Sequence, residues 1–204
     1  MIVVIDYKMG NIGSILNMLK KIGADAICSS EISEIQKAEK IILPGVGSFD
    51  NAMKNINDRG IVQTLNKRVL LEKIPILGIC LGMQLFALKS EEGNSAGLGW
   101  INADVVKFKF DQDTSNLKTP HMGWNTVSKK KESMLLDEMD GEARFYFVHS
   151  FHLLCREKAD ILLTTNYGYE FVSAIQKGNI YGVQFHPEKS HRFGMKLLKN
   201  FVEI

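Results

Sequence analysis

The chain has little excess charge of either sign. Its 204 residues carry 25 Lys and Arg against 23 Asp and Glu, which leaves a net charge of +2. Such an even balance gives no electrostatic reason to expect nucleic acid or an anionic membrane surface as a partner. The basic run at residues 129–131 is followed at once by Glu132, which is typical of a solvated turn.

Long apolar runs and paired cysteines are also scarce. The longest stretch without a charged residue covers residues 74–88 and falls short of the roughly 20 apolar residues that span a bilayer. The cysteines, Cys28, Cys80 and Cys155, are odd in number and widely spaced, unlike a disulfide framework. The first residues carry no basic leader, and their apolar run stops at Asp6. We therefore expect a cytoplasmic chain with no membrane partner, in which Cys28 and Cys155 are buried structural cysteines.

No motif for a metal or a cofactor stands out. The sequence has no H-E-x-x-H and no paired C-x-x-C, and His149 and His152 lack a cysteine or carboxylate at metal-ligand spacing. Residues 10–13 follow a predicted strand but lack the dinucleotide-binding fingerprint, and no Walker-type loop occurs. We therefore expect neither a metal nor a cofactor.

Short apolar runs alternate with helical patterns in the first half and crowd together in the second. Strands are expected at residues 2–6, 41–45, 76–79, 105–110, 145–149, 161–165, 172–176 and 180–185, and helices at 12–22, 61–70 and 193–202. Pro44 is expected to end the second strand. The alternation predicts an α/β fold with a mostly parallel sheet covered on both faces, and the later strands predict hairpins or mixed pairing. With no repeat or linker, one domain is expected over residues 1–204.

Cys80 stands between two glycines, directly after a predicted strand and directly before a predicted helix. The pattern from Gly78 to Gly82 is G-x-C-x-G, a nucleophile elbow with cysteine in place of serine. The glycines would allow a sharp turn, and the helix N-terminus would lower the pKa of the thiol. The Leu81 N–H would face a developing oxyanion, and Gln84 would lie on the same helical face as Cys80. A buried, unreactive cysteine is the alternative.

A candidate base and its orienting group lie together near the C-terminus. In "QFHPE" a predicted strand ends before His186, and Glu188 follows two residues later. Extended backbone projects both side chains to the same side, and Pro187 keeps His186 out of the helical region. The glutamate can then hold the imidazole in one tautomer, so Cys80, His186 and Glu188 form a candidate catalytic triad. A strand-end turn without catalytic function is the alternative.

These motifs belong to a series that runs through nearly the whole chain. The series is "DYKMGN" (6–11), "LPGVGSF" (43–49), "GICLGMQLF" (78–86), "SEEG" (90–93), "PHMGWN" (120–125), "YFVHSF" (146–151), "NYG" (166–168) and "YGVQFHPEKS" (181–190). The chain resembles the class I, or triad-type, glutamine amidotransferases, and within them the glutaminase subunits of imidazole glycerol phosphate synthase. Lys8 and Met9 depart from the small residue common in the first motif, and Phe151 replaces a usual tyrosine.

The resemblance implies a three-layer, flavodoxin-like α/β fold and hydrolysis of L-glutamine to glutamate and ammonia. Cys80 would attack the carboxamide, His186 would carry the proton to the leaving ammonia, and Glu188 would orient His186. The backbone amides implied for the oxyanion hole are those of Leu81 and of Val46 or Gly47. The residues implied for glutamine binding are Gly45, Gln84, Glu92, Ser150 and Phe151.

Two of these implied sites have simpler alternatives. In this family residues 44–47 can act as a switch, and their glycines make a peptide flip sterically cheap. A plain strand-ending turn would explain the same residues. Glu92 would suit the ammonium of a bound amino acid, but it could also be a charge that faces solvent.

The resemblance also implies a partner, a cyclase subunit with a (β/α)8 barrel, in a heterodimer. Ammonia would pass through a channel to that cyclase, which makes imidazole glycerol phosphate and AICAR from PRFAR in histidine biosynthesis. The residues implied to face it are Asn11, Trp124, Tyr146 and Lys189. A position in the core is the alternative for Trp124.

Three other interpretations stay open. A related glutaminase subunit could supply ammonia for amidination of a surface-polysaccharide sugar, since relatives of that kind share these motifs. A non-catalytic binding module with the same fold would usually lack the nucleophile, whereas Cys80, His186 and Glu188 are all present. The extended "GICLGMQ" motif and the implied glutamine pocket weigh against a cysteine peptidase.

Overall fold

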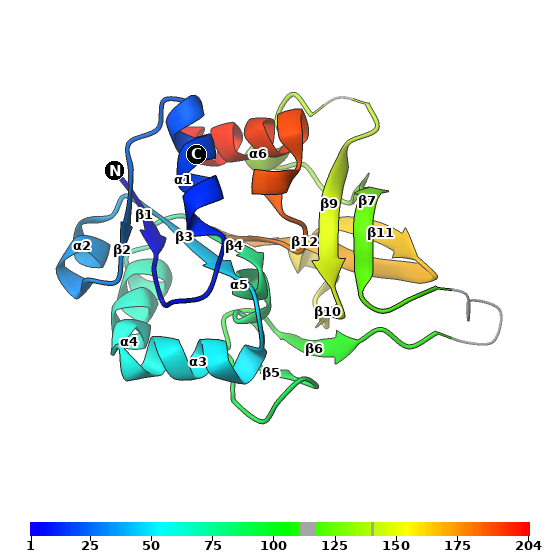
Figure 1. Cartoon of the computed structure of the whole chain (residues 1–204), viewed down its shortest axis with the longest axis horizontal. Coiled ribbons are helices and arrows are strands. Elements are labelled where there is room, and N and C mark those ends of the chain that lie inside the picture. Colours follow the sequence, from blue (N-terminus) through cyan, green and yellow to red (C-terminus); the bar gives the residue numbers. More distant parts are fainter. Residues whose placement is uncertain (111–116, 140) are drawn as a thin grey trace.

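The computed structural model describes residues 1–110, 117–139 and 141–204 (Figure 1). The strands are β1 (Ile2–Ile5), β2 (Ala26–Ser29), β3 (Lys40–Gly45), β4 (Ile76–Cys80), β5 (Lys89–Ser90), β6 (Ala103–Lys107), β7 (His121–Thr126), β8 (Ser128–Lys129), β9 (Arg144–His149), β10 (Phe151–Cys155), β11 (Ile161–Tyr167), β12 (Tyr169–Lys177) and β13 (Ile180–Val183). The helices are α1 (Ile12–Lys21), α2 (Ile32–Lys37), α3 (Phe49–Asp58), α4 (Ile61–Asn66), α5 (Leu81–Gln84) and α6 (His191–Glu203), with π-helical η1 (Lys67–Leu71) and 3₁₀ turns η2 (Met134–Leu136), η3 (Lys158–Asp160) and η4 (Pro187–Lys189).

Every strand and helix expected from the sequence is present, with shifted ends. The sequence did not predict several elements, among them β2, β7, β10, α2 and α3. In β7 the apolar pattern is weak, because Met122 and Trp124 are exposed and the residue between them is a glycine. In α3 the pattern is present, since Phe49, Ala52, Met53 and Ile56 are buried at helical spacing.

The main sheet joins a parallel half to a mostly antiparallel half, as the sequence predicted. Its strand order is β2-β1-β3-β4-β13-β12-β10-β6-β5, with β11 pairing to β12 and β8. Strands β2, β1, β3, β4 and β13 run parallel, and the expected hairpin connects β12 to the antiparallel β13. Strands β7 and β9 form a separate antiparallel pair.

Helices cover the parallel half on both faces (Figure 1). On one face α1 and α6 pack through residues such as Leu19 and Phe201. On the other face α2, α3 and α4 pack through Ile35, Met53 and Leu65. Burial on both faces explains why the parallel strands are continuous apolar runs. Within the described residues, no helix combines the length and apolar character needed to cross a membrane.

Pro44 lies inside β3 and does not end it, contrary to the sequence-based expectation. It is paired in register with Ile79, and Gly45 is paired with Cys80. On its other side β3 pairs with β1 only through residues 40–42. Because no β1 residue opposes Pro44 there, the missing proline N–H costs the sheet no hydrogen bond.

The parallel order brings the candidate catalytic residues to one edge. Strands β3, β4 and β13 are neighbours, and all three end at the same side of the sheet. Val46 follows β3, Cys80 ends β4, and His186 follows β13 by three residues. Loops at the carboxyl ends of parallel strands are where α/β proteins place their ligands.

Replacing Gly82 by alanine is expected to lower the free energy of unfolding by about 3 kcal/mol. A Cβ at this position would lie 1.8 Å from the carbonyl oxygen of Leu43, which is backbone and cannot move aside cheaply. Gly13→Ala in α1 is the matched control, because no atom lies within 4 Å of its Cβ and helix propensity favours alanine. Urea unfolding measures both, and equal stability of the two variants would contradict the prediction.

Candidate active site

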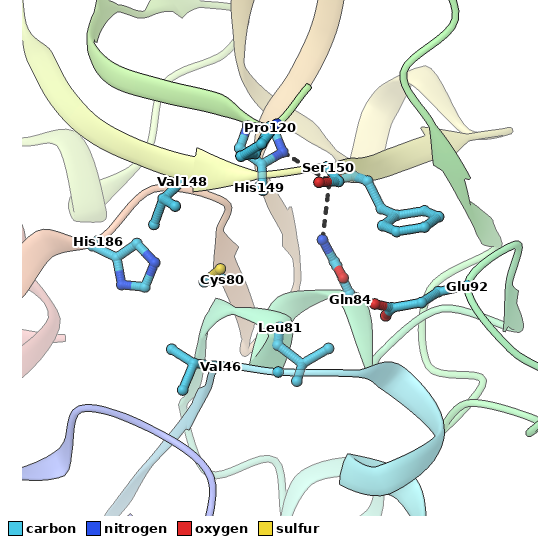
Figure 2. Close-up of a pocket in the computed structure, with 12 residues that line it drawn as sticks. Val46, Cys80, Leu81, Gln84, Glu92, Pro120, Val148, His149, Ser150 and His186 are labelled. Carbon is cyan, nitrogen blue, oxygen red and sulfur yellow. Dashed lines mark hydrogen bonds between the residues drawn. The ribbon is translucent and has the colours of Figure 1, made fainter. Parts of the chain in front are cut away.

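A cavity of about 340 Å³ opens where β3, β4 and β13 end (Figure 2). Its volume is near the lower end of the range for small-molecule sites. The cavity wall includes nine residues that the sequence singled out: Cys80, His186, Leu81, Val46, Gly47, Gln84, Glu92, Ser150 and Phe151. Two others, Glu188 and Gly45, are not part of this wall. The wall also contains Pro120, Val148 and His149, to which the sequence assigned no role.

Cys80 itself carries the strained backbone of the elbow. Its φ is 55° and its ψ is −112°, a conformation that is uncommon for a residue with a side chain. The flanking glycines make room for this turn: a Cβ on Gly78 would lie 2.7 Å from the Phe86 ring, and one on Gly82 would meet Leu43. The glycines let the chain pack tightly around Cys80 while Cys80 takes the strain.

The helix after Cys80 is a single turn. Helix α5 begins at Leu81, as expected, and ends at Gln84. Beyond it, the carbonyls of Leu85, Phe86 and Ala87 accept hydrogen bonds from backbone amides of residues 98–101. Those carbonyls therefore pair with a neighbouring loop, and a long helix dipole behind the thiol is not present here.

His186 and Glu188 form a buried hydrogen-bonded pair. Nδ1 of His186 lies 2.8 Å from Oε1 of Glu188, and both side chains are almost fully buried. His186 is extended, but Glu188 lies in the 3₁₀ turn η4, which corrects the expectation of extended backbone throughout. Pro187 begins this turn, and the Ser190 hydroxyl closes it by donating to the His186 carbonyl across 2.6 Å.

The second ring nitrogen of His186, Nε2, lies on the side of the ring that faces Cys80 (Figure 2). Nε2 is buried and has no hydrogen-bond partner among the described residues, and the ring faces Cys80 across the cavity (Figure 2). Burial alone would lower the pKa of His186, but the nearby Cys80 and the Glu188 carboxylate that is hydrogen-bonded to Nδ1 outweigh it. Together they raise the pKa of His186 from 6.5 to about 10. The arrangement therefore favours a protonated His186 between Cys80 and Glu188.

Gln184 is a site residue that the sequence analysis missed. It is fully buried, its Nε2 donates to Cys80 Sγ across 3.7 Å, and its Oε1 accepts from Gln84 Nε2 across 3.0 Å. Gln84 Nε2 also donates to the carbonyl of Phe151 across 3.1 Å. Gln84 therefore uses its amide nitrogen within the protein and keeps its oxygen for the cavity. The sequence did contain a signal for Gln184: it precedes His186 by two residues, and residues two apart in extended backbone project to the same side.

Two predicted glutamine-binding residues make structural contacts. Glu92 reaches the cavity, and its Oε2 also accepts from the Phe49 N–H at the start of α3 across 2.8 Å. Gly45 lies beside the cavity, where a Cβ would come 2.4 Å from the Tyr7 hydroxyl. That hydroxyl donates to the Pro44 carbonyl across 2.6 Å, which anchors the segment leading to Val46.

An exposed apolar surface borders the cavity on β7 and β9. Met122 pairs with Val148 and Trp124 with Tyr146, so the four side chains share one face. Trp124 is 44% exposed, which excludes the alternative of a core position. Two further side chains extend this surface: His191 stacks on Trp124 at 5.5 Å, and Lys189 lies 5.7 Å over the Tyr146 ring. Because Val148 also lines the cavity, this surface continues to the cavity mouth.

Asn11, the remaining residue expected to face a partner, occupies the N-cap position of α1 without a side-chain capping hydrogen bond. It is half-buried at the N-terminus of α1, where its Oδ1 accepts from the Ser14 hydroxyl across 3.0 Å. Helix α1 packs beside η4, the turn that carries Lys189.

The other two cysteines differ from Cys80 and from each other. Cys155 is half-buried, and burial raises the pKa of its thiol to about 12. Cys28 is exposed, which corrects the expectation that it is buried, because β2 lies at the edge of the sheet. Neither lines the cavity.

Comparisons with known proteins agree with this geometry. A family model described as glutamine amidotransferase class-I matches residues 3–204. The chain is 56% identical over 203 residues to imidazole glycerol phosphate synthase subunit HisH 2 of Methanococcus maripaludis, covering 100% of this chain and 99% of the relative. It is 50% identical over 204 residues to the subunit of the same name from Pseudomonas aeruginosa, covering 100% of both. A glutamine amidotransferase structure from Thermotoga maritima matches at a TM-score of 0.66 and 20% identity, covering 99% of this chain and 80% of that chain.

These comparisons settle the family. The structural match is a likeness in fold, whereas the family model and the two relatives match essentially from end to end. The chain belongs to the class I glutamine amidotransferase family.

Proposed function

We propose that the chain hydrolyses L-glutamine to glutamate and ammonia, with Cys80, His186 and Glu188 as the catalytic triad. The observation that carries the proposal is the placement of His186 between the Cys80 elbow and the Glu188 carboxylate at one cavity. Family membership and the cavity volume support it further.

The proposed reaction starts from a Cys80 thiolate and a protonated His186. The Cys80 thiolate attacks the carboxamide carbon of glutamine and forms a tetrahedral oxyanion. The C–N bond then breaks, and the nitrogen leaves as ammonia with the proton from His186. Water next gives a proton to His186 as its oxygen attacks the glutamyl thioester. Glutamate leaves, and the thiolate and imidazolium are restored.

Backbone amides at the cavity are suited to the oxyanion and to the ends of glutamine. The Leu81 N–H, together with that of Val46 or Gly47, is the proposed oxyanion hole. Glu92 is proposed to bind the ammonium, and the backbone around Ser150 and Phe151 to bind the carboxylate. Support comes from the position of all these residues on the cavity wall.

We propose that the chain works as the glutaminase subunit of an imidazole glycerol phosphate synthase. The names of the relatives from M. maripaludis and P. aeruginosa support this assignment. The apolar surface of Met122, Trp124, Tyr146 and Val148 is the proposed docking site for the cyclase subunit. A partner seated there would cover the cavity mouth and keep ammonia from water.

Glutamate release is the test of this assignment. The purified chain is assayed alone and then with a histidine-pathway cyclase and PRFAR, and the cyclase is expected to increase glutamate release strongly. Trp124→Ala is expected to reduce that increase, whereas Leu154→Ala, which removes a side chain 58% exposed on β10, should preserve it. Release that ignores the cyclase would reject the histidine-pathway assignment and retain the chemistry.

A second acceptor for the ammonia is the alternative assignment. The cavity geometry does not depend on which partner receives the ammonia, so a glutaminase subunit that supplies ammonia for amidination of a surface-polysaccharide sugar would use the same residues. Stimulation by a sugar-amidinating partner and its sugar substrate, and not by the cyclase with PRFAR, would establish this alternative.

A further inference from the structure

A series of hydrogen-bonded polar side chains continues from the cavity along one face of the β7–β9 pair. His149 is the last residue of β9, and His121, the first residue of β7, is its partner in register. His121 is 3% exposed and His149 is 6% exposed. Asn125 lies on the same side of β7 as His121, four residues further on.

The hydrogen bonds leave each histidine one tautomer. Nδ1 of His149 lies 2.7 Å from the Phe151 carbonyl oxygen, which can only accept, so Nδ1 carries the proton. Nε2 of His149 is then the acceptor for Nδ1–H of His121, at 3.1 Å. Nε2 of His121 in turn accepts from the Asn125 amide across 3.2 Å. The proton positions thus follow from one fixed end of the series.

Asn125, at the end of this series away from the cavity, is also held in place by hydrogen bonds. The amide nitrogen of Asn125 also donates to the Asn166 carbonyl across 2.9 Å, and its oxygen accepts from the Thr126 N–H. Burial lowers the pKa of His121 to about 4 and holds the pKa of His149 far below its ordinary value. Both rings are therefore neutral at pH 7, as the single-tautomer series requires.

At the cavity the series meets the residues that contact Cys80. The Phe151 carbonyl accepts from both His149 and Gln84, and Figure 2 draws a dashed line from each of these two side chains. The second proton of the Gln84 amide goes to Gln184, which donates to the Cys80 sulfur. A displacement of the Phe151 carbonyl would therefore reach Cys80 through two amide groups.

We infer that His121 and His149 are positioning residues, which hold the Phe151 carbonyl and thereby orient Gln84, Gln184 and the Cys80 sulfur. This inference rests on the proposed glutaminase activity. Strand β7, which carries His121 and Asn125, also carries Met122 and Trp124 on its opposite face. The proposed docking surface and the positioning series are thus two sides of one strand.

A packing role for the same histidines requires only their shape. Both rings lie among Phe108, Phe147 and Phe171, so loss of either ring disturbs an aromatic cluster. His152 offers a matched control in that cluster. It is 4% exposed and lies 4.8 Å from the Phe108 ring, but it bonds to Leu153 and Tyr169 and does not line the cavity.

The experiment compares His149→Leu, His149→Asn and His152→Leu in the full chain, by glutamate release and thermal unfolding. Leucine at position 149 removes the donor, and we expect kcat/KM for glutamine to fall about tenfold. Asparagine keeps an N–H donor where Nδ1 stands, and we expect it to recover most of the activity. His152→Leu should lose similar stability and keep its kcat/KM within about twofold of wild type.

His121→Leu and His121→Asn repeat the comparison one step further from the cavity. Recovery by asparagine at both positions, with His152→Leu active, would support the inference. Equal losses of kcat/KM in His149→Leu and His152→Leu, or no recovery by asparagine, would overturn it. A wild-type chain that releases no glutamate with any partner would instead reject the proposed function, and the inference with it.

Discussion

A Cys80→Ser variant is expected to lose glutamate release from glutamine by about 10³-fold or more. The hydroxyl has nearly the shape of the thiol but does not ionise near neutral pH, so the proposed thiolate nucleophile is lost. His186 would also lose the negative charge that helps to raise its pKa. Removal of a nucleophile typically costs about this much or more, because the remaining groups act only as a unit with it. Steady-state glutamate release with the ammonia-accepting partner present measures the loss.

Cys28→Ser and Cys155→Ser are the controls for this prediction. Both make the same chemical change at sites outside the cavity, and both are expected to keep glutamate release near the wild-type rate. The thiol of Cys155 has a pKa raised to about 12 by burial, so it offers no thiolate at neutral pH. Activity in Cys80→Ser that matches these controls would contradict the assignment of the nucleophile and favour a non-catalytic module.

A Glu188→Gln variant is expected to lower kcat about 100-fold and to move the alkaline limb of its pH profile to lower pH. The amide can still accept from Nδ1 of His186, but it carries no charge. His186 would therefore release its proton at lower pH, and less imidazolium would remain to protonate the leaving ammonia. Wild-type kcat should persist until the pH approaches about 10, the raised pKa of His186. Measurement of kcat from pH 6.5 to above about 10 compares the two limbs.

The same pair links stability to pH. The pKa of His186 in the folded chain lies above its ordinary value of 6.5, so protonation favours the folded state. That contribution is complete below pH 6.5 and is lost as the pH rises through about 10. The difference in unfolding free energy between wild type and Glu188→Gln should therefore be largest below pH 6.5 and should shrink toward pH 10.

Glu203→Gln, which changes an exposed carboxylate on α6, is the control for both measurements. It should leave the alkaline limb and the stability difference unchanged, because surface ion pairs contribute little. An alkaline limb at the same pH in wild type and Glu188→Gln would show that Glu188 does not set the pKa of His186.

Sequence alone predicted most of the elements and most of the cavity wall. Apolar runs gave the strands because burial on both faces leaves no room for alternation, and motif spacing placed Cys80 and His186 at strand ends. The sequence misplaced Cys28, which lies on an edge strand. It also misjudged Pro44, because strand pairing on each side of β3 is not visible in a one-dimensional pattern.

By itself the sequence determined the local chemistry of this protein, since a nucleophile elbow and a His-Pro-Glu turn are each made within a few consecutive residues. Only the tertiary structure decided that β13 lies beside β4 and so joins the two. It also brought Gln84 to Gln184 and His121 to His149, pairs separated by 100 and 28 residues. Such contacts depend on sheet order and strand register, which arise from the packing of the whole chain and leave no local pattern.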